Sequence, residues 1–113
     1  MNEKMNSRIL RTLPRGKAFY FFTSIGNYTG ESASSLKEFM DRLNEVNMKS
    51  IEFHFYRGDF KKWVDEVLED KELADELGEL QETNASGVLL RNQLYATISK
   101  RYKELANKLS FSI

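Results

Sequence analysis

The chain has 113 residues with 17 basic and 17 acidic side chains, so its formal net charge at pH 7 is zero. An apolar content of 41% and a charged content of 30% are typical of one soluble globular domain. The absence of cysteine excludes disulfides, thiolate chemistry and cysteine-ligated zinc. Neither a membrane span of about 20 apolar residues nor a secretory signal is recognisable, so we expect a cytoplasmic protein.

The charges are unevenly distributed along the chain. Residues 1–17 and residues 83–113 each carry five basic side chains and one acidic, whereas residues 59–82 carry three basic and ten acidic. We therefore expect a basic N-terminal segment, residues 1–17, followed by a single helical domain, residues 18–113. Basic ends can complement an acidic middle within one chain or across a homo-oligomer, although solvated helix faces explain the same pattern.

The N-terminal third of the chain predicts only short elements. A short amphipathic turn is expected over residues 7–13, and Pro14 should end it. Residues 18–23 (AFYFFT) predict a strand or a buried extended segment, because aromatic residues favour pleated structure. Residues 26–30 predict a turn; as a hairpin tip it would return the chain in a weak second strand over residues 31–34.

Ser35 and Glu38 form a capping box, which predicts the start of a helix. Asn47 should mark the end of that helix. Its buried face is expected to consist of five apolar side chains: Leu36, Phe39, Met40, Leu43 and Val46.

Two short helices are predicted after residue 58. Asp59 precedes an apolar stripe over residues 60–68 and is expected to be the N-cap. Asp70 is the expected N-cap of residues 71–80, which would leave a tight corner at Glu69 and Asp70. Upstream, residues 51–57 fit a half-buried strand as well as they fit a short helix.

After a loop over residues 83–87, residues 88–109 contain the longest helical pattern. Its expected inner face is Leu90, Leu94, Ile98, Tyr102, Leu105 and Leu109. The predicted fold is mainly α, with about five helices in a small bundle and at most a short N-terminal β-hairpin or extended segment.

Residues 54–63 (HFYRGDFKKW), followed by residues 73–77 (LADEL), resemble a family of small uncharacterised domains that are prokaryotic and largely archaeal. The shared pattern is a histidine, then Asp-Phe-x-x-Trp, then a Leu-Ala helix. Members are similar to segments attached to enzymes of the trehalose-synthase and glycosyltransferase kind. The resemblance covers roughly Gly16 to Leu80 and implies a mostly helical fold, but no activity. Many relatives have Asn where this chain has Gly58.

His54, Arg57, Asp59 and Trp63, with the neighbouring Tyr56, form the polar cluster most suited to binding a ligand. A histidine near a carboxylate can exchange protons near neutral pH, and an arginine can hold an anion. The structural alternative is that Asp59 caps a helix, Trp63 anchors the core and His54 bonds a backbone carbonyl. Motif-level assignments of this kind favour the structural alternative.

Other signals are weaker. Residues 19–22, four consecutive aromatics beside Arg15 and Lys17, suggest either a stacking platform for single-stranded nucleic acid or a core segment with one open face. The acids of residues 65–82 lack the spacing of a calcium loop. With one histidine and no cysteine, we expect no metal site and no cofactor.

These observations favour a non-enzymatic binding or regulatory module that recognises a protein or a small ligand. The alternative is a nucleic-acid-associated protein that uses the basic termini and the aromatic run. A small enzyme that uses His54 and Asp59 is the weakest hypothesis, because no catalytic motif accompanies them.

Overall fold

The fold is given by a computed structural model that describes the backbone of residues 2–111 and the side chains of residues 4–107. Helices make up 66% of it, five of them with seven or more residues, and a two-stranded antiparallel hairpin lies on the N-terminal side. The mainly α prediction is therefore confirmed. The elements are α1 (Asn2–Ile9), η1 (Arg15–Lys17), β1 (Phe19–Ser24), β2 (Asn27–Ala33), α2 (Leu36–Leu43), α3 (Met48–Arg57), α4 (Asp59–Trp63), the π-helix η2 (Val64–Leu68), α5 (Lys71–Gln81) and α6 (Gly87–Phe111).

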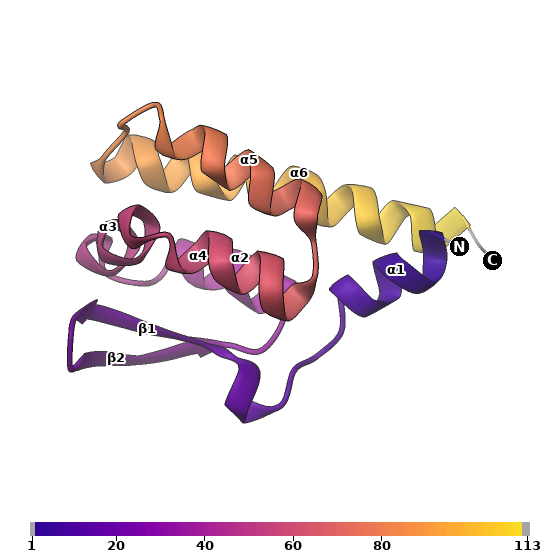
Figure 1. Cartoon of the computed structure of the whole chain (residues 1–113), viewed down its shortest axis with the longest axis horizontal. Coiled ribbons are helices and arrows are strands. Elements are labelled where there is room, and N and C mark those ends of the chain that lie inside the picture. Colours follow the sequence, from indigo (N-terminus) through magenta and orange to yellow (C-terminus); the bar gives the residue numbers. More distant parts are fainter. Residues whose placement is uncertain (1, 112–113) are drawn as a thin grey trace.

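The elements stack in three layers (Figure 1). The hairpin forms one side, the short helices α2, α3 and α4 form the middle, and α5 packs beside α6 on the other side. Helix α1 lies beside the C-terminal end of α6. No helix of residues 2–111 has both the length and the hydropathy needed to cross a membrane.

An aromatic cluster fills the space between the hairpin and the middle layer. Phe19 of β1 lies at its centre, with ring centroids 5.6 Å from Phe39, 5.1 Å from Phe60 and 5.7 Å from Trp63. Phe21 is also fully buried, whereas Tyr20 is exposed. Because side chains alternate along a strand, the aromatic run is a core segment with one open face.

The hairpin differs from the prediction in the position of its turn. The tip is the two-residue loop Ile25–Gly26, and β2 already begins at Asn27. Gly26 has φ of 83°, which glycine adopts without strain and which a tight hairpin turn requires. The expected turn at residues 26–30 was therefore wrong: Gly30 lies inside β2, at an irregularity of the register.

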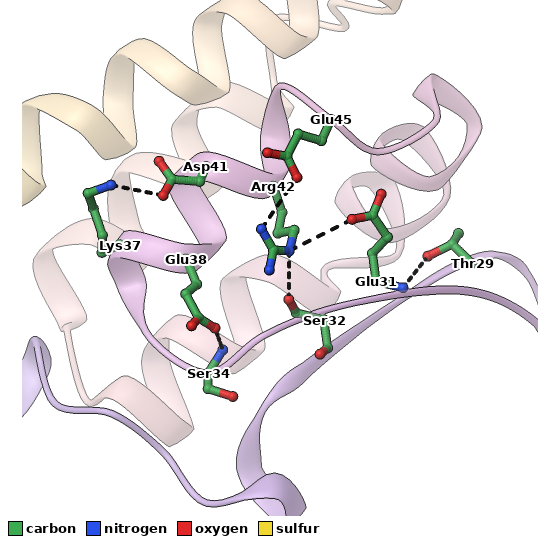
Figure 2. Close-up of polar contacts among 9 residues, drawn as sticks. All are labelled: Thr29, Glu31, Ser32, Ser34, Lys37, Glu38, Asp41, Arg42 and Glu45. Carbon is green, nitrogen blue, oxygen red and sulfur yellow. Dashed lines mark hydrogen bonds and ion pairs between the residues drawn. The ribbon is translucent and has the colours of Figure 1, made fainter.

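Helix α2 covers the edge of β2 (Figure 2). Arg42 Nε donates to the Ser32 carbonyl at 3.0 Å, and Glu38 Oε1 accepts from the Ser34 N–H at 2.8 Å. Ser35 Oγ accepts from the Glu38 N–H at 3.1 Å, so Ser35 is the N-cap as predicted. These contacts occupy backbone groups that an open strand edge would expose.

Two boundaries near the middle helices differ from expectation. Helix α2 ends at Leu43, and Asn47 is the N-cap of α3, where it accepts from the Lys49 N–H at 2.8 Å. Asn47 was thus wrongly read as a stop, because asparagine suits both helix ends. Residues 51–57 are helical, which settles the ambiguity between strand and helix.

The N-terminal part of the chain forms the helix α1 over Asn2–Ile9, which begins earlier than the amphipathic turn expected over residues 7–13. The Leu13 N–H donates to the Ser34 carbonyl at 2.7 Å, so this part of the chain has left the helix before Pro14. Ile9 and Leu13 are buried in the same core as the rest of the chain. The division into residues 1–17 and 18–113 stays a prediction.

The predicted helix over residues 60–68 is interrupted by a π-helical turn. It ends at Glu69, whose φ of 64° is left-handed, and the Asp70 N–H bonds back to the Val64 carbonyl at 3.0 Å. The corner at Glu69 and Asp70 is confirmed, and Asp70 caps α5 by accepting from the Leu73 N–H.

Asp70 also forms a buried ion pair with Arg101 of α6. Arg101 Nε and Nη2 donate to its two carboxylate oxygens at 2.8 and 3.1 Å. Arg101 was not predicted to be buried, whereas Leu90, Leu94 and Ile98 are buried as expected. Tyr102 is only partly buried, and the side chain of Leu109 lies outside the described residues.

Replacing Arg101 should strongly destabilise the fold. Arg101→Met leaves the Asp70 carboxylate buried without its partner, and we expect a loss of about 3–5 kcal/mol in the free energy of unfolding. Urea denaturation measures it. Lys103→Met, an exposed position on the same helix, is the control and should change stability by less than about 0.5 kcal/mol. Equal effects of the two variants would contradict the role assigned to the pair.

Candidate functional site

The site is built around His54, the single histidine of the chain, which α3 directs toward β1. His54 Nε2 accepts a hydrogen bond from the Phe22 N–H at 2.8 Å. An accepting nitrogen carries no proton, so the proton of the neutral ring lies on Nδ1. Nδ1 is 2.8 Å from Asp59 Oδ2 and donates to it. The prediction that His54 bonds a backbone carbonyl was wrong in direction, since the ring accepts a backbone N–H.

The environment of His54 favours the neutral imidazole. Burial lowers its pKa below the ordinary value of 6.5, and the positive charge of Arg57 lowers it further. The hydrogen bond and the charge of Asp59 act in the opposite direction, but burial has the larger effect. A proton on Nε2 would also remove the acceptor that the Phe22 N–H uses. The ring therefore serves as a neutral link between a strand and a carboxylate.

Gly58 places Asp59 for this contact. Its φ of 82° is left-handed, and its N–H bonds the carbonyls of His54 and Phe55, which ends α3. Asn is the other residue type that tolerates this conformation. Gly58, not Asp59, is the N-cap of α4, so the N-cap prediction for Asp59 was wrong. Its carboxylate is instead turned to His54 and Arg57.

Arg57 lies at the surface beside this pair. Its guanidinium is 4.6 Å from the centre of the Phe53 ring, one helical turn earlier in α3, which is a cation–π contact. Its Nε forms an ion pair with Asp59 Oδ2 at 3.4 Å. The side chain is 49% exposed, and its terminal nitrogens have no hydrogen bond to the described residues. The guanidinium is thus oriented from two sides and open on a third.

A groove of about 310 Å³ opens next to Arg57, between the hairpin and α3. Phenylalanine and tyrosine rings make up four of its ten lining residues, and the hairpin tip contributes Ile25 and Gly26. The lining residues are Phe19, Tyr20, Phe22, Ser24, Ile25, Gly26, Phe53, His54, Arg57 and Asp59. A concave, mainly apolar space with a few convergent polar groups is the usual form of a ligand site.

The structure brings three of the five predicted site residues together at the groove: His54, Arg57 and Asp59. Trp63 is buried beside it, and its Nε1 donates to the Lys17 carbonyl at 2.9 Å. It lines a neighbouring hollow of about 230 Å³, which shares Phe19 and Asp59 with the groove. The Tyr56 hydroxyl donates to the Ala85 carbonyl, on a different side of α3. Trp63 and Tyr56 therefore do not line this groove.

Sequence reasoning missed the hairpin tip and Phe53. Phe53 precedes Arg57 by four residues, and this spacing brings two side chains together on a helix. The alternation of side chains along a strand is a signal that could have separated Tyr20 and Phe22 from the buried ring of Phe21. Ile25, 83% exposed at the tip, carried no recognisable signal, because its role depends on where the hairpin docks.

The surroundings of His54 also bear on proton transfer and metal binding at this site. Both ring nitrogens of His54 are engaged and the side chain is buried, so the ring is not poised to accept a substrate proton. Among the described residues, no three histidine, cysteine, aspartate or glutamate side chains are grouped to hold a metal ion. The site thus offers hydrogen bonding and stacking surfaces.

The chain belongs to a family of unknown function, DUF5752. The family model matches residues 14–111, which include all elements from η1 to α6 and every groove residue. No curated protein and no solved structure matches the chain. The family assignment is consistent with the resemblance to uncharacterised domains and carries no activity. Membership of this family thus assigns no role to the groove, and its function must be inferred from the residues that line it.

The stability of the fold should fall when the pH is lowered through 6.5. Because the folded-state pKa of His54 is depressed, the unfolded chain takes up this proton first, and acidification favours unfolding until the folded-state pKa is reached. Urea unfolding of the wild type and His54→Gln at pH 7.5 and 5.5 measures this. The loss should be smaller in the variant, and an equal loss in both would contradict the assignment.

Trp63 should act as a core anchor. Trp63→Ala removes a ring packed 5.2 Å from Phe39, and we expect a loss of about 3–5 kcal/mol. Thermal and urea unfolding measure the change. Trp63→Phe keeps most of the packing and loses the bond to Lys17, so it should cost less. A Trp63→Ala protein as stable as the wild type would contradict the assignment.

Proposed function

We propose that this protein is a non-enzymatic binding module and that the groove between the hairpin and α3 is its recognition site. The observation that carries the proposal is the orientation of Arg57. Its guanidinium stacks on Phe53, pairs with Asp59 through Nε and presents its remaining nitrogens beside an aromatic groove. A positioned guanidinium recognises ligand oxygens with little loss of side-chain freedom on binding.

A role in binding fits this arrangement better than a role in catalysis. The His54–Asp59 pair resembles an acid–base dyad in composition, but Nε2 of His54, the ring nitrogen that does not face Asp59, accepts the hydrogen bond of the Phe22 N–H. The pair therefore supports the groove by tying its two walls together. A ligand in the groove contacts residues of β1, the hairpin tip and α3, so binding also strengthens the docking of the hairpin.

The size of the groove favours a small ligand or a single side chain of a partner. Its volume of about 310 Å³ is at the lower end of the range of roughly 300–1,000 Å³ for ligand sites. Tyr20 and Ile25 at its border are exposed apolar surface, to which a larger partner could extend. A small ligand needs only the groove, and we take it as the simplest occupant.

The test is a fragment screen observed by amide chemical shifts of the ¹⁵N-labelled protein, using small carboxylates, amines, sugars and nucleosides. We expect at least one class to shift the amides of residues 20–26 and 53–57 together. Arg57→Gln should weaken that binding at least tenfold, because Arg57 supplies the open donor edge. Lys49→Gln makes the same charge change on an exposed position of α3, away from the groove, and should have no effect.

Two outcomes would contradict the proposal. One is that no fragment shifts the groove amides while the protein is folded. The other is that fragments bind, but Arg57→Gln and Lys49→Gln change the affinity equally. In either case the cluster of Arg57, Asp59 and His54 would serve only to hold the hairpin on α3.

A further inference from the structure

We infer that the groove binds a free α-amino acid with an apolar side chain, an assignment that rests on the proposed function of the groove. The ligand is defined by two opposite charges side by side at the groove, Arg57 and Asp59, next to aromatic walls. A zwitterionic amino acid carries the complementary pair, a carboxylate and an ammonium on one carbon.

The carboxylate position is set by Arg57. One side of the guanidinium is used by the ion pair from Nε to Asp59, at 3.4 Å, and the ring of Phe53 lies 4.6 Å from its central carbon. The side chain is 49% exposed, and its two terminal nitrogens have no hydrogen bond to the described residues, so they remain available to a ligand. Two parallel N–H donors are the usual partner of a carboxylate.

The ammonium position is set by Asp59. Its Oδ2 receives both the Nδ1–H of His54 and the ion pair of Arg57. Its Oδ1 has no hydrogen bond to the described residues, and 28% of the side chain is exposed. An ionised carboxylate has acceptor sites on both oxygens, so Oδ1 remains available to an ammonium group.

The neutrality of the pair disfavours ligands with a single charge. A carboxylate on Arg57 lies near the like charge of Asp59, and an amine on Asp59 lies near the like charge of Arg57. Only a ligand with both charges is attracted at both points. A peptide terminus offers one charged group in place of the pair, so the free amino acid fits better than a chain end.

The side chain of the ligand lies against the rings of Tyr20, Phe22 and Phe53 and under the hairpin tip. Apart from Arg57 and Asp59, no side chain that is charged near neutral pH lines the groove, since His54 is neutral and both of its ring nitrogens are occupied. A charged ligand side chain would therefore lose its hydration without gaining a partner. An aromatic or branched aliphatic side chain gains the apolar contact.

The experiment is calorimetric titration of the full chain with defined probes. L-Phenylalanine and L-leucine are the zwitterions, 3-phenylpropionate has the carboxylate alone, and phenethylamine has the amine alone. Maltose tests a neutral ligand. We expect at least one zwitterion to bind and each singly charged analogue of phenylalanine to bind at least tenfold more weakly than phenylalanine.

Variants locate the binding. Arg57→Gln should weaken amino-acid binding at least tenfold, whereas Lys49→Gln, also on α3, should not change it. Asp59→Asn should selectively reduce the advantage of phenylalanine over 3-phenylpropionate, because it removes the charge that attracts the ammonium. The amide spectrum of each variant checks that it is folded, so a loss of affinity is not a loss of structure.

The outcomes separate this inference from the proposed function. If 3-phenylpropionate, phenethylamine or maltose binds the groove as tightly as either amino acid, the zwitterion assignment is wrong and the groove remains a binding site. If neither amino acid binds while fragments of another class shift the groove amides, the assignment is again wrong. If nothing binds the groove, both the assignment and the proposed function fail.

Discussion

The two hydrogen bonds of the His54 ring on α3 join this helix to β1 and to the start of α4. The Phe22 N–H of β1 reaches one nitrogen, and the carboxylate of Asp59 at the start of α4 reaches the other. An isolated two-stranded hairpin is at best marginally stable in water, so this hairpin depends on docking. Apolar burial of Phe19 and Phe21 supplies the driving force, and the imidazole sets the register of the strand against α3. The groove exists because the hairpin is held in that place.

The two structural aspartates show how the same residue type takes different roles at neighbouring helix starts. Asp70 adopts an extended conformation before α5, caps it and then meets Arg101 of α6. Asp59 is the first residue of α4 and not the residue before it, because Gly58 already turns the chain with a left-handed φ and takes the N-cap position. Its carboxylate is therefore not needed as the cap and is free to orient His54 and Arg57. A shift of one residue relative to the start of the helix thus distinguishes Asp70, a capping residue, from Asp59, a residue of the candidate site.

The sequence predicted the helices well where the signals were local. Ser35 with Glu38, Asp70 and the spacing of Leu90, Leu94 and Ile98 are short-range patterns, and the structure confirms them. The π-helical turn before Glu69 has no such local pattern. Arg101 is also buried because it contacts Asp70, which lies 31 residues away in the sequence.

For the site, the closeness of His54 and Asp59 could be predicted from their positions in the chain. The contact of His54 with Phe22, 32 residues earlier, could not. Trp63 and Tyr56 were grouped with them because sequence proximity does not show which way a helical side chain points.

The two charged side chains at the groove, Arg57 and Asp59, are oriented by the residues that they contact. A surface arginine–aspartate pair alone contributes little, since solvent screens it and both side chains remain mobile. Here the aspartate is held by a buried imidazole and the arginine by a ring on its own helix, so both are oriented before any ligand arrives. Preorganisation of this kind lowers the entropic cost of binding. It also couples the groove to the protonation of His54, because a second ring proton would break the bond to Phe22 and loosen the hairpin wall. The same neutral imidazole that stabilises the fold therefore keeps the candidate site in its binding form.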